Sequence, residues 1–102
     1  MYTVYMLRCN DNSLYTGITN DFEKRYQTHI SQGKDAAKYT KSRKVVAVVA
    51  AWETESRSNA LKLEIRIKKL TKEKKELLVQ NPELVYDLVR DIEGMVINPQ
   101  IR

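Results

Sequence analysis

The feature that most limits the possible folds of this chain is an uninterrupted apolar run, VVAVVAAW, from Val45 to Trp52. β-Branched residues favour strands, and a strand that is apolar at nearly every position is normally covered on both faces. The run is far shorter than the roughly 20 residues that a membrane-spanning helix needs. We therefore expect a buried strand over residues 45–53, helices on both sides of its sheet, and no membrane span.

Length and composition favour a single folded domain. A chain of 102 residues has room for one hydrophobic core, and its 42% apolar and 30% charged residues are ordinary for a globular protein. The single cysteine, Cys9, excludes an internal disulfide, and the amino terminus lacks the pattern of a secretory signal. We expect a cytoplasmic protein.

The charge of the chain is unevenly distributed. Residues 1–75 hold 16 Lys and Arg against 8 Asp and Glu, a balance of +8, whereas residues 76–102 hold 2 against 5, a balance of −3. A basic field attracts polyanions such as DNA or RNA because neutralising phosphates releases condensed counterions. A solvated basic surface is an equally good interpretation of the charge alone.

Two short segments near the amino terminus predict a β-hairpin. Residues 3–8 (TVYMLR) and 14–18 (LYTGI) are rich in β-branched and aromatic residues, which favour strands. The residues between them, CNDNS, are a cluster of turn formers.

A helix is predicted to follow this hairpin. Asn20 is suited to cap its start, with Glu23 completing a capping box. Arg25 and His29, four positions apart, are expected to lie together beside its buried stripe. That stripe comprises Phe22, Tyr26 and Ile30.

The second half of the chain is predicted to be helical. We expect one helix over about residues 58–70, a second over 72–80 capped by Thr71, and a third over 81–94, opened by an Asn-Pro pair and stopped by a glycine. Residues 95–102 show no clear pattern. The apolar arc of the first of these helices comprises Ala60, Leu61, Leu63, Ile65, Ile67 and Leu70.

Glu64 lies near the middle of that apolar arc. Burying an unpaired carboxylate costs several kcal/mol, so Glu64 needs a partner. The partner can be a metal ion, an arginine, or a lysine such as Lys68 one turn on. The helix by itself leaves these alternatives open.

Motifs in order along the chain resemble the GIY-YIG nuclease superfamily. TVY at residues 3–5 stands where the family has its first motif, YTG at 15–17 where it has its second, and DFEKR at 21–25 begins its first helix. AKYT at 37–40 resembles the signature of the small stand-alone, single-domain bacterial group of the UPF0213 type. The resemblance covers roughly residues 2–80. The residues that match the family's functional positions are Tyr5, Tyr15, Arg25, His29 and Glu64.

The resemblance implies an α+β fold. It predicts a three-stranded antiparallel β-sheet flanked by α-helices, in the order β-β-α-β-α plus C-terminal helices. A catalytic-type domain would span residues 1–80, and residues 81–102 would form a C-terminal helix and tail packed on or trailing the same domain.

The resemblance also implies a metal-dependent endonuclease that hydrolyses nucleic-acid phosphodiesters, with a role in DNA repair or processing. One Mg²⁺ or Mn²⁺ would be held by Glu64 and bound weakly without substrate, because Mg²⁺ fills its other positions with water and substrate phosphate. Arg25 would donate hydrogen bonds to the phosphate as charge builds on its oxygens. Tyr15 would take the proton from the attacking water, directly or by way of the metal, with Tyr5 positioning it. His29 would relay a proton or bind phosphate.

The shared tyrosine site sets a condition on the hairpin. Strand side chains alternate between faces, so Tyr5 and Tyr15 share one face only if Tyr5 pairs with Gly17 and Leu7 with Tyr15. That register requires a loop of three or five residues. Gly17 itself suits either a close approach of backbone or substrate, or a strand-end bulge.

Residues 31–44 (SQGKDAAKYTKSRK) are predicted to form a basic loop that contacts nucleic acid, DNA rather than RNA. Because the region after residue 80 is short and acidic, we expect low sequence specificity unless a protein partner supplies it. The candidate contacts are Lys34, Lys38, Tyr39, Lys41, Arg43 and Lys44.

Two other functions fit the same residues. The first is a nucleic-acid-binding module that has the GIY-YIG fold but is catalytically weak or inactive, for which the basic loop and first helix suffice. The second is a protein-interaction role in which the acidic final helix is the contact.

Overall fold

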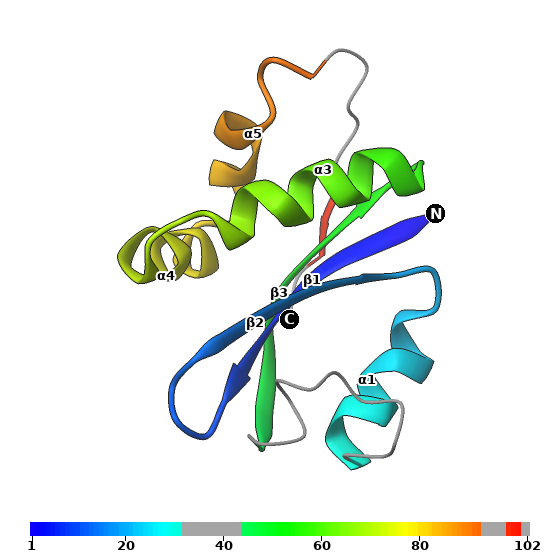
Figure 1. The fold of residues 1–102 in the computed structure, drawn as a ribbon, viewed down its shortest axis with the longest axis vertical. Helices are drawn as coiled ribbons and strands as arrows, with labels where there is room; N and C mark the ends of the chain where they lie inside the picture. The colour runs from blue at the N-terminus through cyan, green and yellow to red at the C-terminus, as the bar shows by residue number, and fades with distance from the viewer. Residues whose placement is uncertain (32–43, 93–97, 101–102) are drawn as a thin grey trace.

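The computed structural model describes residues 1–31, 44–92 and 98–100, and for residues 28–31 and 98–100 it describes the backbone only. The chain forms an α+β fold around an antiparallel sheet with strand order β2-β1-β3-β4 (Figure 1). Along the chain the elements are β1 (Tyr2–Cys9), β2 (Leu14–Thr19), α1 (Phe22–Ser31), β3 (Val45–Thr54), α3 (Arg57–Lys68), α4 (Lys72–Gln80), the 3₁₀ turn η1 (Pro82–Leu84), α5 (Val85–Leu88) and β4 (Asn98–Gln100).

The sheet is covered on both faces, as the apolar run of β3 predicted. Figure 1 shows α1 on one side of the sheet and α3, with α4 and α5 beyond it, on the other. Ala50 and Trp52 of β3 are buried in the core beneath α3, whereas Val45 and Ala51 belong to a second core beneath α1. The three long strands are those predicted.

The hairpin has the register that places both tyrosines on one face. Tyr5 pairs with Gly17 and Leu7 with Tyr15. The Asn12 N–H donates to the Cys9 carbonyl at 2.9 Å, and Asn12 has φ 69°. This is a type I turn followed by a left-handed residue, a common way to join strands through three loop residues. The predicted odd-numbered loop is therefore confirmed.

The cap of α1 lies one residue later than predicted. The Lys24 N–H donates to Asp21 Oδ1 at 3.3 Å, and the Arg25 N–H donates to the Asp21 carbonyl at 3.1 Å. The capping box of Asn20 and Glu23 is thus wrong. Asp21 is held in place by its own N–H, which donates to Thr19 Oγ1 at 3.0 Å and fixes the turn out of β2.

The start of α3 and the range of α4 agree with prediction, whereas the buried face of α3 differs. Ser56 caps α3, its side chain accepting from the Asn59 N–H at 3.1 Å, and Thr71 caps α4 over the predicted range. Ile65 is 50% exposed, so the apolar arc of α3 is narrower than predicted. The fully buried residues of α3 are Ala60, Leu63 and Ile67.

The long helix predicted over residues 81–94 is wrong. Its start is a 3₁₀ turn in which the Asn81 side chain makes no capping hydrogen bond, and α5 ends at Leu88. At that end, Arg66 Nη1 of α3 donates to the Leu88 carbonyl at 2.8 Å and competes with the backbone hydrogen bond of a continuing helix. The segment is docked on the sheet by Trp52, whose Nε1–H donates to the Pro82 carbonyl at 3.0 Å.

The tail contains a strand that the sequence did not predict. Asn98–Gln100 pairs with residues 51–53 of β3, so the sheet gains a short fourth strand.

Within the described residues, none of the helices combines the length and apolarity that crossing a bilayer requires.

Candidate active site

The candidate site is built around two tyrosines on the α1 side of the sheet. Tyr5 lies on β1 and is 1% exposed, whereas Tyr15 lies on the edge strand β2 and is partly exposed. Their ring centroids are 6.2 Å apart. The ring centroid of Phe22 on α1 lies 5.3 Å from that of Tyr5, and the Phe22 ring is stacked on Tyr26. Helix α1 therefore covers Tyr5, the inner tyrosine, and leaves Tyr15, the outer tyrosine, accessible.

The Tyr5 ring can occupy its position because residue 17 is a glycine. A Cβ at Gly17 would lie 2.7 Å from the Tyr5 hydroxyl oxygen, 2.8 Å from Tyr5 Cζ and 3.0 Å from Tyr15 Cε2. Real Cβ atoms do not approach other atoms so closely. The glycine of the YTG motif therefore serves the close approach of the Tyr5 side chain, whereas the sequence suggested an approach of backbone or substrate, or a bulge.

Three of the other predicted groups, Tyr15, Arg25 and Glu64, act on the Tyr5 hydroxyl. Burial is the main cause that raises the pKa of Tyr5 above its ordinary value, and the nearby Tyr15 hydroxyl acts in the same direction. A hydrogen bond from the Arg25 guanidinium and its positive charge act against this, and the charge of Glu64 raises the pKa again. Tyr5 is therefore a neutral phenol at physiological pH, held by Arg25 of α1.

Glu64 reaches this site from the opposite layer. It lies on α3, which packs on the other face of the sheet, and its side chain is 15% exposed. Its only ion pair within the described residues is with Lys68, whose Nζ lies 3.5 Å from Glu64 Oε2 on a side chain that is 52% exposed. The lysine foreseen as one of three alternative partners is thus present, but the contact is long and open to water.

The chemistry of Glu64 fits a hard divalent cation. Mg²⁺ and Mn²⁺ prefer carboxylate oxygens, and Mg²⁺ commonly takes one or two protein carboxylates and fills its other positions with water and phosphate. Within the described residues there is no cluster of three or more His, Cys, Asp or Glu that could enclose an ion. A metal here would be held by one protein carboxylate and by its substrate.

The predicted nucleic-acid contacts fall mostly outside the described residues. That is the case for the candidates between residues 32 and 43 and for the side chain of His29. Lys44 is described and exposed. Its N–H donates to Asn10 Oδ1 at 3.3 Å, and its carbonyl accepts from the Asn10 N–H at 2.8 Å, so it lies at the hairpin loop. The candidates outside are Lys34, Lys38, Tyr39, Lys41 and Arg43.

Three lysines beside the site were not singled out as nucleic-acid contacts from the sequence. Lys68 and Lys75 line a hollow of about 240 Å³ together with Tyr15. Lys72 and Lys75 line another of about 370 Å³ at the hairpin loop. Lys72 and Lys75 are three positions apart on α4, a spacing that places them on one side of that helix. Lys68 belongs to α3, and no local pattern relates it to the other two.

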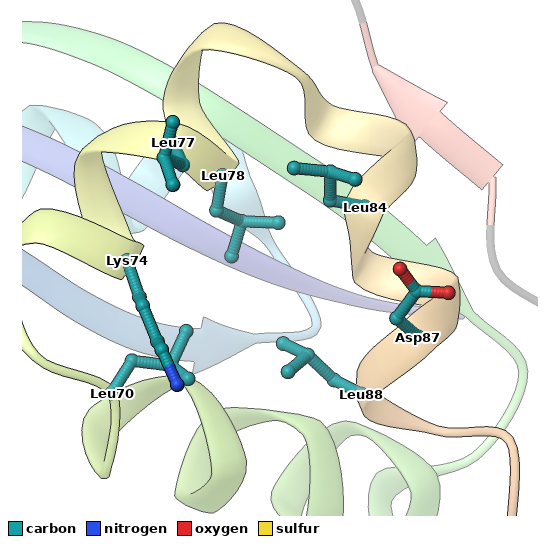
Figure 2. A pocket seen from close by; sticks show the side chains of 7 residues that line it. All are labelled: Leu70, Lys74, Leu77, Leu78, Leu84, Asp87 and Leu88. Atoms are coloured by element: carbon teal, nitrogen blue, oxygen red, sulfur yellow. The ribbon is translucent and has the colours of Figure 1, made fainter.

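A third hollow has a different character. It has a volume of about 300 Å³ and lies between α4 and α5, and none of the predicted site residues lines it. Figure 2 shows leucine side chains around it, with Lys74 and Asp87 at its margin. Its leucines are Leu70, Leu77, Leu78, Leu84 and Leu88.

Comparisons with known proteins agree with these motifs. Residues 1–76 match the model of the family described as the GIY-YIG catalytic domain. A UPF0213 protein of Fusobacterium nucleatum is 46% identical over 94 residues, which cover 92% of this chain and 89% of that protein. A UPF0213 protein of Syntrophus aciditrophicus is 52% identical over 81 residues, which cover 78% and 92%.

A solved structure is also similar. The solution NMR structure of a UPF0213 protein from Bacillus halodurans is 37% identical and has a TM-score of 0.53, with 91% of this chain and 98% of that one covered. From its first motif to α4, the chain therefore belongs to the GIY-YIG catalytic-domain family and, within it, to the UPF0213 group.

Proposed function

We propose that this chain is a metal-dependent endonuclease that hydrolyses phosphodiester bonds in nucleic acid, with DNA as the preferred substrate and a cytoplasmic role in DNA repair or processing. The observation that carries the proposal is the convergence on the Tyr5 hydroxyl. Arg25 donates a hydrogen bond to it, and Tyr15 and Glu64 both raise its pKa from separate elements. Membership in the GIY-YIG family supports the same chemistry.

Glu64 is the proposed protein ligand of one Mg²⁺ or Mn²⁺. When bound, such an ion supplies Lewis-acid stabilisation of the phosphate. The carboxylate offers hard oxygens, and its partial exposure leaves room for water and substrate oxygens beside it. Affinity for the ion should be low until a phosphodiester completes the site.

The other residues act on the phosphate and on the attacking water. Arg25 donates to the nonbridging phosphate oxygens as negative charge builds on them. The water oxygen forms the new bond to phosphorus while the bond to the leaving oxygen breaks. The Tyr15 oxygen is the proposed acceptor of that water's proton, and His29 or solvent gives a proton to the leaving oxygen. Tyr5 stays neutral and orients Arg25 and Tyr15.

The test is a cleavage survey with the purified chain. Labelled single-stranded, duplex and branched DNA and a matching RNA are incubated with Mg²⁺, with Mn²⁺ and with EDTA. We expect cutting that needs a divalent ion, is abolished by EDTA and is faster on DNA than on RNA. Failure to cut any substrate with either ion would contradict the proposal.

A second candidate is a nucleic-acid-binding module without useful turnover. It is favoured by one observation, the Lys68 ammonium 3.5 Å from the Glu64 carboxylate, since a lysine can neutralise the charge that a metal would otherwise need. In that case the survey yields salt-sensitive binding without cutting. For either function, we propose that a protein partner supplies sequence specificity.

A further inference from the structure

The two hollows beside β2 adjoin each other, and we treat them together as one path. Both are lined by Leu14 and Lys75. The first extends from these residues to Tyr15, Thr16 and Lys68. The second extends to the hairpin loop and Lys72. The path therefore runs along the edge strand from the loop to the outer tyrosine of the candidate site.

The described side chains that line this path carry three positive charges, on Lys68, Lys72 and Lys75, against one negative charge, on Asp11. Glu76 accepts from both Arg8 and Lys72, with Arg8 Nη2 to Glu76 Oε1 at 2.6 Å and Lys72 Nζ to Glu76 Oε2 at 2.9 Å. Asp11 Oδ1 accepts from the N–H and hydroxyl of Ser13 within the loop. The Lys68 ammonium is 52% exposed beside Glu64.

Lys75 is the cation at the centre of the path. It lines both hollows, and its ammonium has neither a hydrogen bond nor an ion pair within the described residues. It is half-buried, as is usual for a lysine that covers apolar surface with its aliphatic stem and keeps its ammonium in water. An ammonium held in this way, beside an edge strand with no neighbour on its outer side among the described residues, is suited to an anion.

We propose that this path, from the hairpin loop through Lys75 and Lys68 to Tyr15, binds the phosphodiester backbone of the nucleic-acid strand on one side of the bond to be cut. The inference rests on the proposed function because it uses Tyr15 as the end of the path. A nucleic-acid backbone is the occupant that charge complementarity and continuity with the site favour. Phosphates carry no sequence information, so the path positions the strand without selecting bases.

The direct test compares two adjacent lysines of α4. Lys75 lines the path, whereas Lys74 lines the leucine hollow (Figure 2). Lys75→Ala should weaken binding of a short labelled DNA strand roughly fivefold, and lower the slope of log affinity against log salt by about 0.7. Lys74→Ala removes the same charge, but it should change both the DNA affinity and its salt dependence much less.

A phosphate scan tests the geometry. Single neutral methylphosphonate linkages are placed at successive positions on either side of the cleaved bond. One linkage, on one side only, should weaken binding of the unmodified chain as much as Lys75→Ala does and have no further effect in the Lys75→Ala variant.

The outcomes separate this inference from the proposed function. Equal effects of Lys75→Ala and Lys74→Ala, or a Lys75→Ala defect that no single linkage reproduces, would overturn the path whether or not the chain cuts DNA. Salt-dependent binding that Lys75→Ala weakens, without cutting, would support the path and contradict the nuclease. Binding to a poly-glutamate peptide but to no nucleic acid would overturn the path in favour of an acidic protein partner.

Discussion

At the scale of single residues, Gly17 connects the sequence motif to the site. Its hydrogen is the only substituent that fits beneath the Tyr5 ring, which is buried and cannot move away freely. The glycine of the YTG motif indicates, from the sequence alone, that another group approaches the strand closely. The identity of the approaching atoms could not be predicted, because it depends on a cross-strand pairing with β1.

Gly17→Ala is expected to destabilise the fold and displace Tyr5. The added methyl would overlap the Tyr5 hydroxyl, and overpacking of this kind costs about 1–3 kcal/mol in the free energy of unfolding. Urea denaturation measures the cost. The same change should cost less in a Tyr5→Leu background, where the ring end is missing; equal costs in the two backgrounds would show that the tyrosine is not what Gly17 accommodates.

The raised pKa of Tyr5 should make the free energy of unfolding decrease at alkaline pH. The ordinary phenol pKa is about 10, and burial raises that of folded Tyr5. Above about pH 10 the unfolded chain releases this proton while the folded chain retains it, so the free energy of unfolding decreases as pH rises, by up to about 1.4 kcal/mol per pH unit. Tyr5→Phe should show a shallower decrease in urea denaturation between about pH 8 and pH 11. An identical pH dependence would mean that Tyr5 ionises in the folded chain.

At the scale of elements, a charge network fixes α4 to the hairpin. Arg8 of β1 and Lys72 of α4 both donate to Glu76, and Lys72 also donates to the Asn12 carbonyl in the hairpin loop. By fixing α4, the network positions the lysines that line the path beside β2. It joins residues far apart in sequence, and no local pattern predicts such a contact.

Glu76 gives this network a pH dependence. Hydrogen bonds from Arg8 and then Lys72 lower its pKa from 4.5 to about 2. The stabilisation is therefore complete above about pH 4.5 and is lost as pH falls toward 2. Because Glu76 is partly exposed, we expect it to contribute on the order of 1 kcal/mol.

Acid unfolding of Glu76→Gln measures that contribution. The variant should be less stable than the unmodified chain at neutral pH and lose less stability on acidification. Glu83→Gln, which removes an exposed carboxylate of η1, is the matched control and should follow the unmodified chain. If both variants titrate alike, the Arg8–Glu76 contact does not stabilise the fold.

The start of a helix could be predicted where one residue is clearly the best cap, but not where two neighbouring residues are equally good caps. Thr71 is the only strong cap before α4, and it was predicted correctly. Asn20 and Asp21 are both good caps, and the hydrogen bond from Asp21 to Thr19 decides between them. The helix after Asn81 was overestimated because its local pattern does not show the tertiary hydrogen bonds that Trp52 and Arg66 donate to the carbonyls of Pro82 and Leu88.

At the scale of the whole molecule, the layering followed from the sequence and the full shape of the site did not. An apolar strand over residues 45–54 requires cover on both faces, and the sheet has it. The tyrosines could be placed on one face from strand alternation. Glu64 approaches from the opposite layer, and the lysines from two helices meet at β2, so only the folded arrangement relates them to Tyr15.

The central claim is that Glu64 supplies the metal ligand of a phosphodiester hydrolase, and single-turnover cleavage of labelled DNA over a Mg²⁺ titration tests it most directly. The unmodified chain and Glu73→Gln, which removes an exposed carboxylate from the first turn of α4, should cut at equal rates. Glu64→Gln should cut at least about 100-fold more slowly at saturating DNA, while its salt-dependent affinity for DNA stays within about twofold. Equal cutting by Glu64→Gln and Glu73→Gln, or no metal-dependent cutting by the unmodified chain, would contradict the account.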